Sequence, residues 1–279
     1  MDIPLLLKSE VILRGSFTGR WSDQGAFDYI QKIEGELAKA KDNRRVTKFE
    51  FEGNTYYLKH HVGVGWKEII KNLLQFKLPV LGARNEWDAL ETLAPSSIYT
   101  MEAVAFGQHG INPAKQESFL ITRELKDTIS LEKLCLSWRH NPPAYTIKKA
   151  LIEKVARMAR TLRDLGLNHR DFYLCHILLD VSDGIENIDP EKIKIYLVDL
   201  HRMQQRRKVP ERWLVKDIGS LYFSALDIGL TRRDILRFLL CYDGKKTLLS
   251  KNIDFWKQVK SRAQSLQKKV HKYKADFPL

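Results

Sequence analysis

Cysteine is scarce in this sequence. Cys135, Cys175 and Cys241 are the only cysteines among 279 residues, and no two of them form a CxxC pair. An odd, sparse set argues against a disulfide framework and favours a reducing compartment.

Long apolar runs are also absent. The amino terminus has an acidic second residue and an apolar run of only five residues, Ile3 to Leu7, whereas a signal peptide has a basic start and a longer apolar stretch. No window approaches the roughly 20 apolar residues that span a bilayer. We therefore expect a protein that is soluble or peripherally attached to a membrane.

Acidic residues are too few to balance the basic ones. Asp and Glu number 34 against 47 Lys and Arg, which gives a formal net charge of +13. Such a surface is expected to meet an anion: nucleic acid, phosphorylated glycan, acidic lipid or an acidic protein. Nucleic-acid binding would place basic residues beside aromatic ones for base stacking, and the sequence shows no such motif.

Strand patterns dominate the first 120 or so residues. KFEFEGNTYYLKHH (residues 48–61) alternates apolar and polar residues around the turn Glu52-Gly53-Asn54, which predicts a β-hairpin. Other patterns predict a helix over 26–40, a polar turn over 41–45, helices over 67–76 and 83–93, and a strand over 119–122.

Helix patterns dominate the remainder. In residues 145–165 the apolar positions recur at spacings of three and four, which is one stripe of a helix, and Gly166 suits its end. Thr231 and Asp234 suit a capping box for a helix over 232–242. An apolar strand, 195–198, ends at Asp199. The fold class is therefore α+β, with domains at 1–122 and 123–279.

Four features occur in the order that phosphoryl transfer requires. Lys59 ends the hairpin and can pair with nucleotide phosphates, and Glu86 on the following helix can orient it. His169-Arg170-Asp171 matches the catalytic-loop triplet of kinases, with Asp171 as the base. Asp199 follows an apolar strand, as the magnesium-binding aspartate of kinases does. We therefore expect a protein-kinase-like bilobal fold that uses ATP and Mg²⁺, with three of these residues, Lys59, Asp171 and Asp199, around one triphosphate.

Two features depart from the protein-kinase pattern. No GxGxxG precedes the hairpin, so Arg44 and Arg45 are the candidates for covering the phosphates, against the alternative of a solvated basic turn. His176 occupies the position of a metal-binding asparagine. Because imidazole is a poorer magnesium ligand than oxygen, His176 is either a metal ligand or a hydrogen-bond partner while Asp199 carries most of the metal.

Long motifs resemble a known family. KEIIKNLLQFKLPVLGARNEWDAL, NHRDFYLCHILLD, and DLHR followed by KDIGSLYFSALDIGLTRRD are similar to lipopolysaccharide core heptose kinases of the WaaP type. The family pattern HRDxYxCH includes the histidine found here at 176. The resemblance runs from about residue 20 to 260.

The resemblance implies transfer of the γ-phosphate of ATP to an inner-core heptose, most of all the first heptose. It implies a nucleotide-covering amino-terminal lobe and a carboxy-terminal lobe with the catalytic loop, metal site and acceptor site. The protein would then be cytoplasmic and act at the cytoplasmic face of the inner membrane. Glu124, just beyond the boundary at residue 122, is a further candidate for nucleotide binding. His169 and Asp217 are given structural roles, Asp217 as the helical acid that braces the catalytic loop.

The segment between Asp199 and Asp217 is strongly basic. We assign the acceptor site to Arg202, Arg206, Arg207 and Arg212, since cationic side chains suit a glycolipid that bears acidic sugars and phosphates. For any one of them a solvated loop is an equal alternative. Residues 251–274 carry eight Lys or Arg and one acid, which suits either lipid headgroups or a packed helix with a solvated face.

Other functions stay open at this point. The acceptor could be a second heptose, Kdo or a protein side chain, because fold does not decide substrate. The chain could also be a non-catalytic, kinase-like scaffold that binds an anionic ligand, and an acidic protein is a further candidate partner. Zinc binding by His169, Cys175, His176 and His201 is disfavoured because no metal-ligand spacing repeats.

Overall fold

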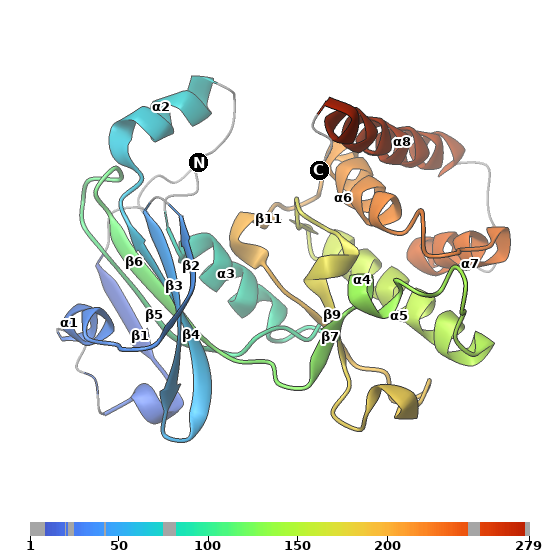
Figure 1. The fold of residues 1–279 in the computed structure, drawn as a ribbon. Helices are drawn as coiled ribbons and strands as arrows, with labels where there is room; N and C mark the ends of the chain where they lie inside the picture. The colour runs from blue at the N-terminus through green and yellow to red at the C-terminus, as the bar shows by residue number, and fades with distance from the viewer. Residues whose placement is uncertain are drawn as a thin grey trace. The chain divides into compact units, whose positions relative to one another are not determined.

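The computed structural model describes residues 9–19, 21, 25–41, 43–74, 82–244 and 252–276 (Figure 1). Its contacts divide the chain into two compact units. Unit 1 contains Met1–Thr92 and Met101–Leu125, and unit 2 contains Leu93–Thr100 and Lys126–Leu279. The predicted domains at 1–122 and 123–279 stay a prediction. Residues 1–8, on which part of the signal-peptide expectation depends, lie outside the described residues.

Unit 1 is built on one antiparallel sheet of six strands in the order β1-β5-β6-β4-β3-β2. The strands are β1 (Glu10–Leu13), β2 (Glu36–Lys41), β3 (Arg44–Phe51), β4 (Asn54–Val62), β5 (Ala103–His109) and β6 (Glu117–Arg123). β3 and β4 form the predicted hairpin. Glu52 and Gly53 both have positive φ, 47° and 73°, as a two-residue hairpin turn requires.

The two faces of this sheet carry different helices. Tyr56 and Leu58 of β4 and Phe119 of β6 join a core with Phe17 of the short η2 (Gly15–Phe17) and with α1 (Ala26–Gln31). On the opposite face, Trp87 of α3 (Arg84–Leu93) stacks on Phe106 of β5, with ring centroids 5.1 Å apart. Side chains alternate along a strand, so Lys59, next to Leu58, points to the face that α3 covers, where it contacts Glu86.

The prediction of a helix over 26–40 is wrong beyond Gln31, since Glu36–Lys41 forms strand β2. The sequence ELAKAK has good helix propensity, but its backbone pairs with β3 at the edge of the sheet, and tertiary context overrides propensity. Gly35 lets the chain enter this edge, because a Cβ there would lie 2.2 Å from the Lys48 carbonyl oxygen. The predicted turn over 41–45 is likewise shorter, since Arg44 and Arg45 belong to β3.

The other elements predicted in unit 1 are present. α2 (Gly65–Leu74) covers most of the helix expected over 67–76, whose last two residues lie outside the described residues. α3 and β6 occupy the expected positions. The sequence patterns did not reveal β1 or β5.

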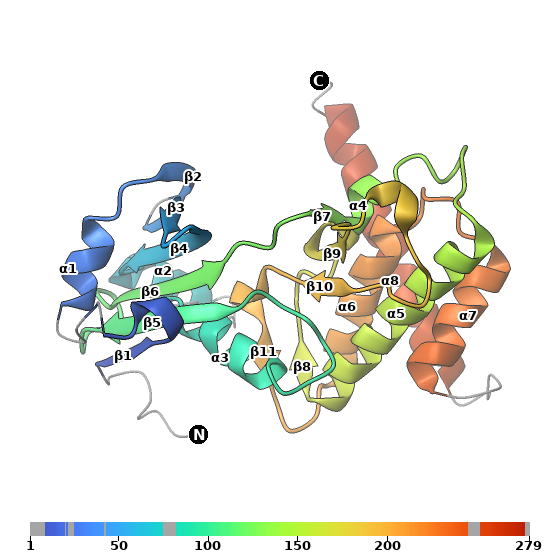
Figure 2. The ribbon, with the colours of Figure 1, turned by 90° about the horizontal axis from the view of Figure 1, so that it is seen from below.

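Unit 2 is mainly helical. Its helices are α4 (Leu131–Leu134), α5 (Tyr145–Asp164), α6 (Glu211–Ser224), α7 (Arg232–Asp243) and α8 (Ile253–Asp276). α5 packs against α7 and α6 against α8 (Figure 2). Unit 2 also contains two small sheets. One consists of β7 (Thr128–Ser130), β9 (Ile177–Asp180) and β10 (Ile195–Leu197), and the other pairs β8 (Leu167–Asn168) with β11 (Gln204–Gln205). Three one-turn helices, η3 (Leu174–His176), η4 (Ile185–Asn187) and η5 (Leu200–Arg202), complete it.

The strongest helix predictions are confirmed in unit 2. Four of the predicted stripe residues of α5 are buried: Leu151, Val155, Met158 and Leu162. Gly166 has φ 73° directly after this helix. Thr231 and Asp234 form the capping box of α7 through reciprocal hydrogen bonds. None of the helices in the described ranges has the length and apolar character needed to cross a membrane.

Candidate active site

Unit 1 brings two predicted residues together. Lys59 of β4 and Glu86 of α3 form an ion pair of 2.5 Å between Nζ and Oε1, with side chains 12% and 1% exposed. Glu86 lies in the first turn of α3, where the helix dipole favours a carboxylate. The pair holds the lysine ammonium in one place, and the slight exposure of Lys59 leaves it open to a second anion.

Of the other nucleotide-binding candidates of unit 1, Arg45 and Glu124 have partners within the sheet, whereas the buried Nε of Arg44 has no hydrogen-bond partner in the described structure. Arg45 donates from Nε to the Thr47 hydroxyl at 3.1 Å, and Arg44 precedes it on the same strand. Glu124 accepts hydrogen bonds from Lys48 (2.6 Å) and from the Tyr57 hydroxyl (3.1 Å). The bond from Lys48 holds the pKa of Glu124 below its ordinary value. Their roles toward a nucleotide stay predictions.

In unit 2 the catalytic-loop candidates are fixed by Asp217 of α6. Its carboxylate accepts the backbone N–H of His169 at 2.7 Å and that of Arg170 at 2.8 Å. Arg170 has φ 73°, an uncommon conformation for a side chain with Cβ. Burial raises the pKa of Asp217 to about 7, although the hydrogen bonds from these two N–H groups act to lower it. The buried acid therefore holds the backbone of the loop in a shape that the loop would not adopt alone.

His169 anchors the same loop from its other side. The ring is fully buried, its Nε2 lies 3.0 Å from the Val198 carbonyl, and its Nδ1 accepts the Asp171 N–H at 3.3 Å. Burial lowers the pKa of His169 to about 4. The ring is therefore neutral, with its proton on Nε2, and it ties the catalytic loop to the strand that leads to Asp199.

The Asp171 carboxylate faces a guanidinium. Arg202 Nη1 lies 2.8 Å from both of its oxygens, and the Asp171 side chain is 20% exposed. The Asp171 carbonyl accepts from His176 Nδ1 at 2.7 Å. Arg202, predicted as an acceptor-binding residue, is therefore in contact with the predicted base, and its role toward the acceptor stays a prediction.

Asp199 has a left-handed backbone, with φ 62° and ψ 53°, and two histidines face its carboxylate. His201 Nδ1 lies 2.6 Å from Oδ1 and His176 Nε2 lies 3.4 Å from Oδ2. A carbonyl can only accept, so the proton of neutral His176 is on Nδ1 and its Nε2 turns a lone pair toward Asp199. Two lone pairs facing each other fit a cation or a proton between them.

A metal at Asp199 would need ligands from elsewhere. Within the described part of the chain, no group of three or more His, Cys, Asp or Glu could hold a metal ion. Mg²⁺, however, is commonly bound by one or two carboxylates together with substrate phosphates. Asp199, with His176 beside it, therefore fits a magnesium ion that the phosphates of a nucleotide hold in large part.

Two of the three remaining arginines of the predicted acceptor site lie at the same aromatic ring. Arg206 donates from Nη2 to Gln204 at 2.6 Å and from Nη1 to Asn168, and both Arg206 and Arg212 lie over the ring of Trp213. Arg207 is exposed. Lys216, one turn after Arg212 on α6, lies over the same ring. So does Arg170, which the sequence did not indicate because it comes from the distant catalytic loop.

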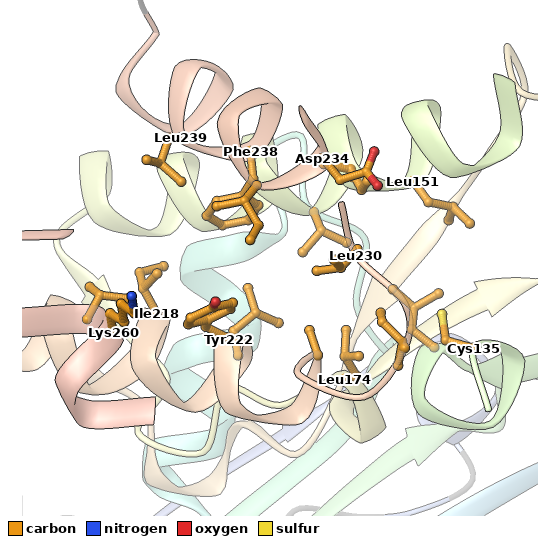
Figure 3. A pocket seen from close by; sticks show the side chains of 18 of the residues that line it. Cys135, Leu151, Leu174, Ile218, Tyr222, Leu230, Asp234, Phe238, Leu239 and Lys260 are labelled. Atoms are coloured by element: carbon orange, nitrogen blue, oxygen red, sulfur yellow. The ribbon is translucent and has the colours of Figure 1, made fainter. Parts of the chain in front are cut away.

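Unit 2 also encloses an apolar cavity of about 220 Å³ that the sequence did not reveal (Figure 3). Its wall includes Leu151 of α5, Ile218 and Tyr222 of α6, and Phe238 of α7. Almost all of its lining is apolar, and a cavity of this character does not attract water. It suits a hydrocarbon group.

The fold and these two sets of residues define a class. A kinase, an enzyme that transfers phosphate to a hydroxyl, has these parts: a lysine on a β-sheet paired with a glutamate of a helix, and a braced His-Arg-Asp loop followed by a strand and an aspartate.

The comparisons give the family. Residues 28–242 match the Lipopolysaccharide kinase (Kdo/WaaP) family. Lipopolysaccharide core heptose(I) kinase WaaP of Pseudomonas aeruginosa is 45% identical over 232 residues, 83% of this chain and 85% of the relative. The same-named protein of Escherichia coli is 42% identical over 263 residues, 93% and 98% of the two chains. The chain belongs to the Kdo/WaaP family of lipopolysaccharide kinases.

A solved structure supports the fold. WaaP in complex with acyl carrier protein is 36% identical to this chain, with a TM-score of 0.79, and the match covers 92% of this chain and 99% of that one. The predicted α+β, kinase-like fold with a β-rich part and a helical part is confirmed, and so is the predicted phosphotransferase class.

Proposed function

We propose that this protein transfers the γ-phosphate of ATP to a hydroxyl of the first inner-core heptose of lipopolysaccharide. The observation that carries the proposal is the catalytic loop, where Asp217 accepts both backbone N–H groups and Asp171 stays partly exposed. Relatives named as heptose(I) kinases, 42–46% identical, support the acceptor.

Each residue has a task that its geometry suits. Lys59, oriented by Glu86 at 2.5 Å, would bind the phosphates, with Arg44 and Arg45 on the same sheet. Glu124, which directly follows β6, would contact another part of the nucleotide. Asp171 would receive the proton of the heptose hydroxyl. Arg202 Nη1, 2.8 Å from both oxygens of Asp171, would hold that carboxylate in orientation.

Asp199 and His176 would hold magnesium. When bound, Mg²⁺ neutralises charge on the transferring phosphate. His201, 2.6 Å from Asp199 Oδ1, would fix the orientation of the carboxylate. His169 and Asp217 would keep structural roles, because both are buried and bind the backbone of the loop.

The acceptor and a carrier would use the basic surface. Arg206, Arg207 and Arg212 would bind acidic groups of the glycolipid at the cytoplasmic face of the inner membrane. The solved relative is in complex with acyl carrier protein, so we propose an acidic carrier as partner of this basic chain. The apolar cavity of unit 2 is where an acyl group would fit.

The test is a phosphate-transfer assay. Purified protein with Mg-ATP is expected to add one phosphate mass to a core glycolipid that lacks it. Asp171→Asn should lower kcat by about 10²–10⁴-fold, because it removes the general base. Asp227→Asn, which alters an aspartate 83% exposed on unit 2, is the matched control and should keep full activity. Equal activity in both variants, or no transfer to any heptose acceptor, would reject the proposal.

A further inference from the structure

Four basic side chains of unit 2 lie over one tryptophan ring, and a fifth lies near one of the four. Lys216 Nζ lies 4.2 Å from the centroid of the Trp213 ring. The guanidinium carbons of Arg212, Arg170 and Arg206 lie 5.5, 5.7 and 5.7 Å from it. Arg262 of α8 is close enough for its charge to lower the pKa of Lys216, after burial itself. We name these residues the Trp213 cluster: Arg170, Arg206, Arg212, Lys216 and Arg262.

The side chains of the Trp213 cluster lack ion-pair partners. Among the residues that the structure describes, no carboxylate forms an ion pair of 4 Å or less with a cluster side chain, although such pairs are common elsewhere in the chain. Asp171 and Asp217 act on Arg170 only from a greater distance. Burial and the charge of Arg212 lower the pKa of Arg206. Contact with the Trp213 ring stabilises each cation only weakly. Like charges held together in this way oppose folding unless an anion joins them.

Hydrogen-bond donors without acceptors lie in the same place. Trp213 Nε1 and Arg262 Nε are buried and have no hydrogen-bond partner in the described structure, and the same holds for Nδ2 of Asn168. Asn168 is fully buried, and its Oδ1 accepts from Arg206 of the cluster. Buried donors are rarely left unpaired. Because all of these groups only donate, an oxyanion is the ligand that would satisfy them.

The backbone is shaped to bring the cluster together. A Cβ at Gly166 would lie 1.8 Å from the Arg206 carbonyl oxygen, and a Cβ at Gly219 would lie 2.5 Å from Cγ of Arg262. The two glycines therefore admit Arg206 and Arg262. α6 begins at Glu211, so the positive end of its dipole lies beside Arg212 and Trp213.

We propose that the Trp213 cluster binds an oxyanion, a phosphate or a sugar carboxylate, of the glycolipid acceptor. This rests on the proposed function and adds Arg170, Lys216, Arg262 and Trp213 to the acceptor site. Arg170 directly precedes the predicted base Asp171 in the chain. An anion bound at the cluster would therefore belong to the molecule whose hydroxyl proton Asp171 receives.

Kinetics test the assignment on exposed residues that the fold does not need. Lys216→Gln and Arg212→Gln are each expected to raise KM for the glycolipid by about tenfold, the effect of losing one charge-assisted hydrogen bond of roughly 1.4 kcal/mol. The kcat and the KM for ATP should stay unchanged. Lys149→Gln removes an exposed charge from α5 and should change nothing. Cluster variants that behave like Lys149→Gln would overturn the proposal.

The acceptor's own acids identify the source of the anion. If the anion is a lipid phosphate, an acceptor from which the phosphates are removed should raise the KM of the wild type to that of Lys216→Gln. The KM of Lys216→Gln itself should not rise further on this acceptor. If it is a sugar carboxylate, reducing the carboxyl groups should have that effect instead. Both results support an oxyanion site. An equal loss in the variants on an acceptor stripped of both groups would refute it, and so would variants that weaken only binding of an acidic carrier protein.

Direct binding separates this proposal from the proposed function. The indole N–H signal of Trp213 in a ¹⁵N spectrum, assigned by its loss in Trp213→Phe, is expected to shift saturably with inorganic phosphate. Arg206→Gln/Lys216→Gln should abolish the shift, and Lys59→Met should keep it. The shift would remain even if no heptose were ever phosphorylated. Its absence in the wild type would refute the site whatever the acceptor proves to be.

Discussion

At the scale of single residues, buried ion pairs serve two different ends in this protein. Lys59–Glu86 leaves part of its lysine exposed. Lys148–Asp234, 3.0 Å long with side chains 10% and 7% exposed, joins α5 to α7. Lys148 also donates to the Gly229 carbonyl at 2.8 Å, and Asp234 completes the capping box of α7. The second pair has every group satisfied within the fold, so its expected effect is on stability.

Asp234→Asn should lower the free energy of unfolding by about 2 kcal/mol at pH 7, because a cap and a buried charge partner are lost. Burial opposes ionisation of Asp234, but the backbone N–H of Thr231 and the Lys148 ammonium keep its pKa below the ordinary value. Folded protein therefore binds fewer protons here than unfolded protein. The stabilisation is complete above the ordinary pKa of about 4 and disappears as pH falls through the folded value.

Denaturant titrations at pH 7, 5 and 3 would measure this difference. The gap between wild type and Asp234→Asn should narrow only below pH 4. Asp254→Asn on α8, whose carboxylate is 88% exposed beside Lys257, is the control and should show little effect at any pH. A gap that stays constant to pH 3 would show that the charge of Asp234 does not matter.

Residue-scale prediction from the sequence succeeded where a short motif fixes the chemistry. The loop His169–Asp171 and the aspartate after its strand could be found because their order and spacing are local. The contact of Arg202 with Asp171 could not, since the two are 31 residues apart. The sequence also gave no sign that Arg170 and Arg206 lie beside Trp213 of α6, because they come from the catalytic loop and from the segment after β11.

At the scale of elements, pattern length decided what could be predicted. The 20 residues of α5 carry a full apolar stripe, and such a stripe has few interpretations. The six residues of β2 have helix-forming composition, and only pairing with β3 makes them a strand. Short edge strands depend on their neighbours, so no local pattern could have placed β2.

Gly166 links two elements and gives a test. Gly166→Ala and Gly53→Ala both place Cβ on a residue with φ 73°, but nothing lies within 4 Å of Gly53, whereas Gly166 faces the Arg206 carbonyl. Gly53→Ala should cost about 1 kcal/mol from backbone strain alone. Gly166→Ala should cost at least about 3 kcal/mol, because β8 and β11 must also separate. Equal losses in denaturant unfolding would mean that the segment at Arg206 yields freely.

At the scale of the whole molecule, the predicted machinery is divided between two units. Unit 1 holds Lys59 and Glu86, and unit 2 holds Asp171, Asp199 and the residues that fix them. The sequence predicted this division because kinase residues occur in a fixed order along the chain. That Lys59, Asp171 and Asp199 serve one triphosphate stays a prediction, and kinetics can test it.

If Lys59 and Asp199 act on the same phosphates in one step, their losses will not add. Lys59→Met and Asp199→Asn should each lower kcat by about 10²–10³-fold, as removal of one charge-stabilising group does. The kcat of the double variant should be less than tenfold below that of the less active single variant, because the remaining group has little left to stabilise once its partner is gone. Two independent sites would instead multiply the two losses. The control is the double variant Lys71→Met/Asp227→Asn, which removes one exposed charge from each unit and should leave kcat unchanged. If the losses of Lys59→Met and Asp199→Asn multiply while the control keeps full activity, a shared nucleotide is refuted.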